Sequence, residues 1–379
     1  MSFYRIRTTP SAVAIDSGGA GGAPASPVSN QRPTPIDGAA AIGSENNNGI
    51  DIDDVTDVDR HVHSEINCYQ NMSSEQVMTV IGKSKIGGMK IMDLGNLVGN
   101  TPLIKLGDRL YAKFETYNPS GSIKDRIGYY ILEKAEERGE LKPGDTIVEA
   151  TSGNTGIAVS MFGTNKGYKV IIVMPCNMSE ERKQMMRMFG AEVIEVEAGD
   201  FDRAIAMRDH ICKEDGFFNF NQFHNPDNIT CHYETTGVEI LQQTEGKKIA
   251  AFLDGTGTGG TLMGVGKRLK ERQPSIKTLA IEPAESPVMS GGEPGLHGIQ
   301  GIGDGSKFLV DLDKVDEVLL VKTDDAIERM KQLHQRGLLV GISSGANVLA
   351  SERWIEENNP DGIVVTILCD RGERYLSCL

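Results

Sequence analysis

The sequence predicts an α/β fold in which mostly parallel sheets are covered by helices. From about residue 90, short runs rich in β-branched residues alternate with stretches of helical spacing. This alternation is typical of parallel strands joined by crossover helices. Two glycine-bearing turns, 149–157 and 254–266, each join such a strand to a helix. Turns of this kind leave backbone N–H groups free to bind an anion.

The elements follow one another regularly along the chain. We expect strands at 101–106, 110–115, 146–150, 169–175, 191–197, 248–255, 277–283, 316–322 and 363–370. We expect helices at 122–139, 179–190, 201–215, 323–337 and 343–358, with two more opening at the glycine turns. No internal repeat beyond the strand–helix unit is visible.

Residues 1–85 differ in composition from the rest, being rich in Gly, Ala, Pro, Ser and Asn, with an acidic run at 50–59. They lack the apolar periodicity of a core, so we predict a largely disordered extension with one possible helix at 73–82. Residues 86–379 would then form the catalytic domain, with a smaller lobe at about 118–228 and a larger lobe from the remainder.

Composition restricts the classes of partner. The net charge of −14 argues against nucleic acid, which needs basic patches. No apolar run is long enough to cross a membrane. Six scattered cysteines without a C-x-x-C pair favour reduced thiols over disulfides or a zinc site. We expect a cytoplasmic protein without a secretory signal. Arg5 and Arg7 leave import into an organelle open, although Asp16 argues against a transit peptide.

The stretch NPSGSIKDR, residues 118–126, places Lys124 in the first turn of a predicted helix. A helix N-terminus carries partial positive charge and favours acids. A surface lysine paired with Asp125 would be the ordinary explanation. The alternative is a lysine facing an anion-binding cavity, where dipole and desolvation both disfavour the ammonium form. A neutral amine is what Schiff-base chemistry requires.

The stretch DGTGTGGTLMGVG, residues 254–266, predicts a phosphate site, because successive glycines let backbone N–H groups converge at a helix start. Gly255, Gly257 and Gly260 also satisfy G-x-G-x-x-G, and Glu282 ends the next strand, so a dinucleotide site is the rival hypothesis. That fingerprint more often opens a sheet, whereas this one follows several strand–helix units. A close-packed turn without a ligand is the third possibility.

The turn EATSGNTGI, residues 149–157, carries Thr151, Ser152, Asn154 and Thr155 around exposed N–H groups. These groups suit a carboxylate or a ring hydroxyl, although a single residue would suffice for simple N-capping. A phosphate loop, a carboxylate cradle and an amine together are the parts needed for pyridoxal phosphate acting on an amino acid.

With these three motifs, the sequence resembles the cysteine synthase (O-acetylserine sulfhydrylase) and cystathionine β-synthase family, the fold-type II pyridoxal-phosphate enzymes. The resemblance covers residues 95–376 and rests on six stretches in the family's order: NPSGSIKDR, EATSGNTGI, DGTGTGGT, HGIQGIG, GISSGAN and LCDRGERY. It implies a two-lobed, three-layer α/β/α fold and, for most members, a homodimer.

The resemblance also implies roles for particular residues. Lys124 would hold pyridoxal 5'-phosphate as an aldimine and later move protons, Asn154 would bond the ring hydroxyl, and Ser343 would face the pyridine nitrogen. The phosphate would lie on Gly257, Thr258, Gly259, Gly260 and Thr261. The substrate carboxylate would lie on Thr151, Ser152, Thr155 and Gln222. No metal is required, and His224, His232 and His297 are interpreted as structural or hydrogen-bonding residues.

The implied reaction is β-replacement on an activated serine, O-acetylserine or O-phosphoserine, with sulfide, giving L-cysteine through an aminoacrylate. Cystathionine β-synthase, using serine and homocysteine, is the nearest alternative. Because the given sequence ends at Leu379, just past LCDRGERYLS, we expect that enzyme's regulatory domain to be lacking. GISSGAN also resembles the synthase version of that turn. Haem ligands in HVHSEINC (His61, His63, Cys68), other β-replacements and a non-catalytic amino-acid-binding relative are further alternatives. Gly298 replaces a lysine of the synthases and Phe-Ile-Pro is lacking, which puts docking of serine acetyltransferase in doubt.

Overall fold

The computed structural model describes residues 93–378, which lie in one compact unit, Gly87–Leu379. The predicted extension at 1–85, its helix at 73–82 and the haem candidates lie outside the described residues. The lobe boundaries also stay a prediction. Among the described residues, no helix is both long and apolar enough to cross a membrane.

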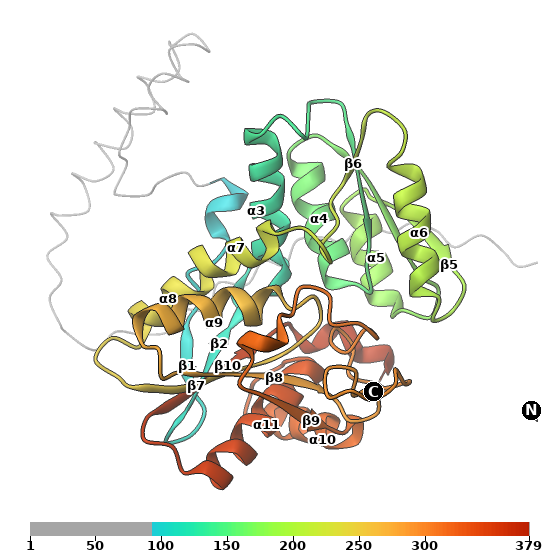
Figure 1. Cartoon of the computed structure of the whole chain (residues 1–379). Helices are drawn as coiled ribbons and strands as arrows, with labels where there is room; N and C mark the ends of the chain where they lie inside the picture. Colours follow the sequence, from blue (N-terminus) through green and yellow to red (C-terminus); the bar gives the residue numbers. More distant parts are fainter. Residues whose placement is uncertain (1–92, 379) are drawn as a thin grey trace, which may run out of the picture. The chain divides into compact units, whose positions relative to one another are not determined.

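Ten strands form two sheets within the described residues (Figure 1). The larger sheet has the order β1-β2-β10-β7-β8-β9, and the smaller has the order β5-β4-β3-β6. Among the strands of these two sheets in the described part of the chain, β1 and β2 pair antiparallel and all other neighbours pair parallel. The larger sheet consists of β1 (Leu103–Lys105), β2 (Leu110–Phe114), β7 (Ile249–Gly255), β8 (Lys277–Pro283), β9 (Glu317–Val321) and β10 (Ile363–Leu368). The smaller sheet consists of β3 (Thr146–Ala150), β4 (Lys169–Pro175), β5 (Glu192–Val196) and β6 (Phe217–Asn219).

Helices cover both faces of each sheet, as the buried residues show. On the smaller sheet, Ala204 of α6 packs with Val148 on one face, and Ile157 of α4 packs with Ile147 on the other. On the larger sheet, α11 joins one apolar cluster and α9 joins another on the opposite face. The helices are α3 (Lys124–Glu137), α4 (Asn154–Asn165), α5 (Glu180–Met188), α6 (Phe201–Ile211), α7 (Asp227–Glu234), α8 (Thr236–Gln243), α9 (Gly260–Arg272), α10 (Thr323–Gln335) and α11 (Ile342–Asn358). The predicted three-layer α/β/α fold with mostly parallel sheets is confirmed.

Short 3-10 segments complete the secondary structure: η2 (Leu94–Leu97), η3 (Glu115–Tyr117), η4 (Leu312–Lys314) and η5 (Gly372–Cys378). Between β8 and η4 the chain runs through a long irregular segment, 284–311. That segment, which we call the 284–311 loop, returns over the start of α9, where Gly303 N–H donates to Thr256 O (3.0 Å) and Leu309 N–H donates to Thr258 O (3.1 Å).

A buried ionic network anchors the start of α3 to the larger sheet. The Arg126 guanidinium contacts Glu115 (Nε–Oε2, 2.6 Å) and Glu239 of α8 (Nη1–Oε1, 2.7 Å). Lys113 of β2 contacts the same Glu239 (2.5 Å). Glu115, Arg126 and Lys113 are all buried, so each charge depends on its partners. The network therefore fixes the helix that begins at Lys124.

Candidate active site

Lys124 is the first residue of α3, as the sequence predicts. The preceding turn closes at Gly121, whose φ of +88° favours glycine, and Gly121 N–H donates to Asn118 O (2.8 Å). Asp125 points away from its neighbour: its buried carboxylate accepts from Ser120 N–H (2.6 Å) and from the Ser120 hydroxyl. The ordinary explanation, a surface pair between Lys124 and Asp125, is therefore wrong.

The 149–157 turn opens α4 through Gly153, whose φ is +156°. Thr151 Oγ1 accepts from Gly153 N–H (3.1 Å), and Thr155 Oγ1 donates to Gln222 Oε1 (2.6 Å). Gln222 comes from the segment after β6, so this hydrogen bond joins two predicted carboxylate-binding groups that lie far apart in sequence. The turn thus has the polar surface that its composition predicts.

Glu149 holds Gln222, one of the predicted carboxylate-binding residues, in place. Its carboxylate, which is fully buried, accepts from Gln222 N–H (3.3 Å) and lies 3.6 Å from Arg208 Nη1 of α6. Burial raises the pKa of Glu149 to about 7, although Arg208 and Gln222 oppose that shift. Gln222 Nε2 also donates weakly to Glu149 (3.4 Å), so the carboxylate orients the Gln222 side chain.

The glycine loop between β7 and α9 is packed so closely that side chains would not fit. A Cβ atom on Gly257 would lie 2.5 Å from Gly301 O, and one on Gly260 would lie 1.8 Å from Asn228 Oδ1. Gly259 adopts the left-handed conformation (φ +86°) just before the first residue of α9. The loop therefore presents backbone N–H groups and a helix N-terminus, the predicted form of a phosphate site.

Two threonines of this loop are held by neighbouring side chains. Thr258 Oγ1 accepts from Asn228 Nδ2 (3.1 Å), and Thr261 Oγ1 is hydrogen-bonded to His232 Nε2 (3.2 Å). The other ring nitrogen of His232 bonds Thr236 Oγ1 (2.9 Å). Burial, together with Arg126 and Lys124, lowers the pKa of His232 well below its usual value. The neutral ring fits the hydrogen-bonding role expected for it.

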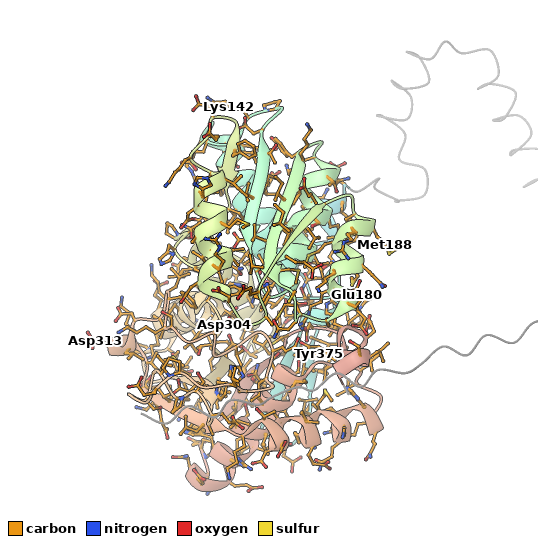
Figure 2. The ribbon with its side chains drawn as sticks, turned by 90° about the vertical axis from the view of Figure 1, so that its right-hand side faces the viewer. Lys142, Glu180, Met188, Asp304, Asp313 and Tyr375 are labelled. Atoms are coloured by element: carbon orange, nitrogen blue, oxygen red, sulfur yellow. The ribbon has the colours of Figure 1, made fainter. Side chains whose placement is uncertain are left out.

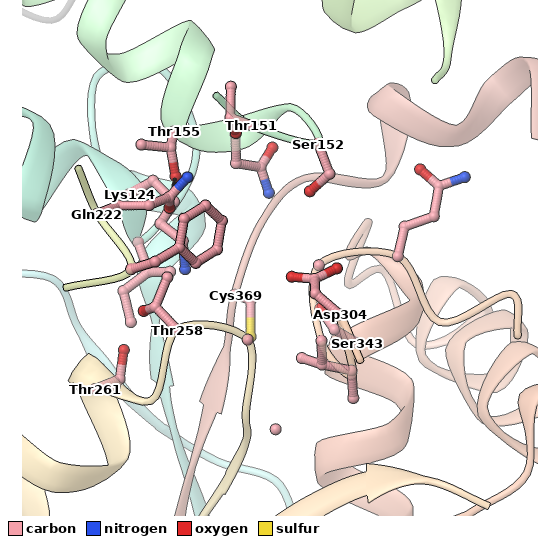
Figure 3. A pocket seen from close by; sticks show the side chains of 18 of the residues that line it. Lys124, Thr151, Ser152, Thr155, Gln222, Thr258, Thr261, Asp304, Ser343 and Cys369 are labelled. Carbon is pink, nitrogen blue, oxygen red and sulfur yellow. Dashed lines mark hydrogen bonds between the residues drawn. The ribbon is translucent and has the colours of Figure 1, made fainter. Parts of the chain in front are cut away.

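The polar turn, the glycine loop and the start of α3 meet at one cavity (Figure 3). Ten predicted site residues line it: Lys124, Thr151, Ser152, Asn154, Thr155, Gln222, Gly257, Thr258, Thr261 and Ser343. Gly259 and Gly260 do not line the cavity; they form the turn that shapes it. Residues from five separate segments of the sequence thus come together around one cavity.

The polar groups of the cavity match those of pyridoxal phosphate. Asn154 donates through Nδ2 to Asp370 Oδ2 (2.6 Å), which leaves its buried Oδ1 without a protein partner. A phenolic hydroxyl would satisfy that acceptor. The glycine loop supplies an anion site, Lys124 an amine and Ser343 a hydroxyl on the same cavity. The donor set therefore fits a ring that carries a hydroxyl, a nitrogen, an aldehyde and a phosphate.

The dinucleotide alternative fits poorly. Glu282, its candidate ribose ligand, is buried and accepts from Met289 N–H (2.8 Å) and Ser290 N–H (2.9 Å) of the 284–311 loop. Its carboxylate therefore organises a loop. The glycine loop accordingly fits a single phosphate better than a dinucleotide.

Sequence reasoning missed several residues of the cavity. Arg182, Asp254, Gln300, Asp304 and Cys369 also line it. Arg182 lies against Tyr375, with its guanidinium carbon 4.8 Å from the ring centroid, and its Nη1 donates to Gln300. Burial raises the pKa of Asp254 to about 7. Gln300 and Asp254 lie within or beside motifs used above, whereas Arg182 reaches the site from an ordinary amphipathic helix, which gives no signal.

The fold and the cavity together fit an enzyme that uses a phosphate-bearing cofactor and a lysine amine. The chain belongs to the pyridoxal-phosphate dependent enzyme family, whose model matches residues 94–370. It is a pyridoxal-phosphate dependent enzyme, as predicted.

Individual members of this family that are similar to the chain include cysteine synthases. A cysteine synthase of Staphylococcus aureus is 45% identical over 297 residues, covering 75% of this chain and 95% of that one. The solved cysteine synthase of Entamoeba histolytica has a TM-score of 0.72 at 39% identity, covering 78% of this chain and 91% of that one. A hydrogen sulfide-producing enzyme from Fusobacterium nucleatum has a TM-score of 0.72 at 43% identity, covering 75% and 89% respectively.

Proposed function

We propose that this chain synthesises L-cysteine by β-replacement on an activated serine, with sulfide as the nucleophile. The observation that carries the proposal is that Lys124, an anion-binding glycine loop and a polar turn suited to a carboxylate line one cavity. The likeness to cysteine synthases over nearly their whole length supports it.

The cofactor would be held by four groups of the cavity. Lys124 would attach it through its amine, the loop Gly257–Thr261 would take its phosphate, Asn154 its ring hydroxyl, and Ser343 its ring nitrogen. When bound, pyridoxal phosphate supplies the electron sink that makes the α-proton of an amino acid acidic.

The side chains of the cavity would bind the substrate, move its proton and exclude water. Thr151, Ser152, Thr155 and Gln222 would hold the substrate carboxylate, and the Thr155–Gln222 hydrogen bond orients two of them in advance. This fixes the α-carbon relative to Lys124, whose amine would take the α-proton as a general base. Closing the smaller lobe over the cavity would exclude water from the reacting β-carbon.

The proposal also covers which activated serine is the substrate and how the chain assembles. Relatives include an O-acetylserine dependent cystathionine β-synthase from Helicobacter pylori, with a TM-score of 0.71 at 35% identity. O-acetylserine is therefore the first donor to test, with O-phosphoserine second. We further propose a cytoplasmic homodimer, by analogy with the family.

Product formation tests the proposal directly. The purified protein, loaded with pyridoxal phosphate, is supplied with sulfide and either O-acetylserine or O-phosphoserine, and cysteine is measured. Cysteine formation with one donor is the expected result. Formation of cystathionine from serine and homocysteine, without cysteine formation from either donor, would assign the alternative reaction. Binding of amino acids without turnover would make the chain a binding protein.

A further inference from the structure

Asp370 is a buried carboxylate that contacts a wall residue of the cavity and that the proposed function does not use. It lies two residues after the end of β10. Its Oδ2 atom accepts from Asn154 Nδ2 (2.6 Å) and from the Tyr375 hydroxyl (2.7 Å). Asn154 lines the cavity, whereas Asp370 does not. The carboxylate therefore reaches a ligand through Asn154 and not by direct contact.

The backbone of Asp370 is joined to the segments that carry two other groups expected around the cofactor ring. Ser122, two residues before Lys124, pairs with Asp370 in an antiparallel bridge. Gly341, two residues before Ser343, donates its N–H to Asp370 O (3.1 Å). Asp370 is thus fixed relative to the starts of both helices, the one that carries the amine and the one that carries the hydroxyl.

The side chain of Asp370 is held from two sides. Its Oδ1 atom lies so close to Gly341 that a Cβ atom on that glycine would not fit. Burial, together with the charge of Asp370, raises the pKa of Tyr375 well above its usual value. Tyr375 therefore keeps its proton and donates a hydrogen bond to the carboxylate. Figure 2 shows Tyr375 between the part of the molecule with the smaller sheet and the part with the larger sheet.

The hydrogen bond to Asp370 determines how Asn154 presents its amide. A carboxylate oxygen accepts hydrogen bonds and donates none, so the amide nitrogen of Asn154 must face Asp370. A hydrogen bond to an ionised acceptor is also stronger than one between neutral groups. The amide oxygen of Asn154 is then left buried without a partner among residues 93–378. What this oxygen lacks is a donor, which a ring hydroxyl would supply.

We propose that Asp370 is a positioning residue of the cofactor site, which fixes the Asn154 amide before the cofactor binds, so that the amide oxygen faces the ring hydroxyl. The inference rests on the proposed placement of that hydroxyl at Asn154. Without the carboxylate, the Asn154 side chain is free to rotate, and binding of the cofactor has to order it. Asp370 removes this cost in advance, since it orders the amide in the unliganded protein.

The test is a double-mutant cycle on the full-length protein, freed of cofactor and titrated with pyridoxal phosphate by visible absorbance. Wild type is compared with Asp370→Leu, Asn154→Ala and the double variant. Asp370→Leu should weaken binding about 2- to 13-fold, which corresponds to ordering one side chain on binding. In the Asn154→Ala background, the same substitution should weaken binding no further, because no amide is left to orient.

Two further variants separate positioning from a general loss of structure. Thr366→Val removes a buried hydrogen bond of β10, from Thr366 Oγ1 to Leu253 O (2.9 Å), at a residue that does not line the cavity. It should lower the melting temperature and leave cofactor affinity unchanged. Asp370→Leu also leaves the buried Tyr375 hydroxyl without its acceptor, which costs stability. The cycle is therefore repeated in the Tyr375→Phe background, where the same coupling is expected.

The outcomes distinguish this inference from the proposed function. Wild-type affinity in Asp370→Leu, or losses that multiply in the double variant, would overturn the role of Asp370. Wild-type affinity in Asn154→Ala would overturn the placement of the ring hydroxyl at Asn154, and the inference with it. If the predicted coupling is measured but the loaded wild type forms no cysteine from either donor, the proposed reaction is wrong and the inference stands.

Discussion

Replacing Gly257 with alanine should weaken cofactor binding, because the glycine loop and the 284–311 loop are in backbone contact at this point. The new Cβ would lie 2.5 Å from Gly301 O, so the two loops must separate by about 1 Å to restore ordinary contact. Overpacking of this kind costs about 1–3 kcal/mol. If that cost falls on the bound state, affinity for pyridoxal phosphate drops by about 5- to 150-fold.

The assay is a titration of the cofactor-free protein with pyridoxal phosphate, followed by visible absorbance. Gly107→Ala is the matched control, since its Cβ would meet only Leu110 Cβ at an ordinary 3.8 Å. The control should bind the cofactor as wild type does. Wild-type affinity in Gly257→Ala would refute the reasoning, because the loop would then tolerate a side chain where the structure leaves no space.

Two further predictions concern stability. Arg126→Met should lower the free energy of unfolding by about 3–5 kcal/mol in urea, because buried Glu115 loses its partner; a loss below about 1 kcal/mol would show that the ion pair is dispensable. Burial raises the pKa of Glu149 to about 7 in the folded protein. The folded state therefore binds this proton more tightly than the unfolded state does. The resulting contribution to the free energy of unfolding is lost as pH rises from about 4.5 to about 7. In Glu149→Gln, the decline of unfolding free energy across that window should be smaller by up to about 3 kcal/mol; an unchanged decline would contradict the shift.

Local sequence pattern predicted much of the fold and of the site. Each expected strand is present, and the glycine turns lie where strand meets helix, because both features depend on neighbours in sequence. Lys124 is at a helix start because Gly121, with its positive φ, closes the turn just before α3 begins. The resemblance to the family added Ser343 and Gln222 to the predicted site. Neither residue has a local sequence pattern that indicates a ligand site.

The remainder depends on contacts between distant segments. The order of strands in the larger sheet places β10 between β2 and β7, which no local pattern specifies. Helices α7 and α8 are absent from the predicted elements, because no helix was expected over 227–243. Arg182 reaches the cavity only because α5 packs near η5, and Asp304 does so because the 284–311 loop folds back over the glycine loop. The amino-acid sequence alone gives no signal that either side chain reaches the cavity.

The most direct test of the central claim is the visible spectrum of the purified protein and of its Lys124→Ala variant, each with added pyridoxal phosphate. For wild type, we predict an absorption band that shifts on adding O-acetylserine and returns on adding sulfide, with cysteine formed. Lys124→Ala should bind the cofactor without a covalent link and form no cysteine. Turnover by Lys124→Ala at the wild-type rate, or a wild-type protein that cannot be loaded with the cofactor, would contradict the account.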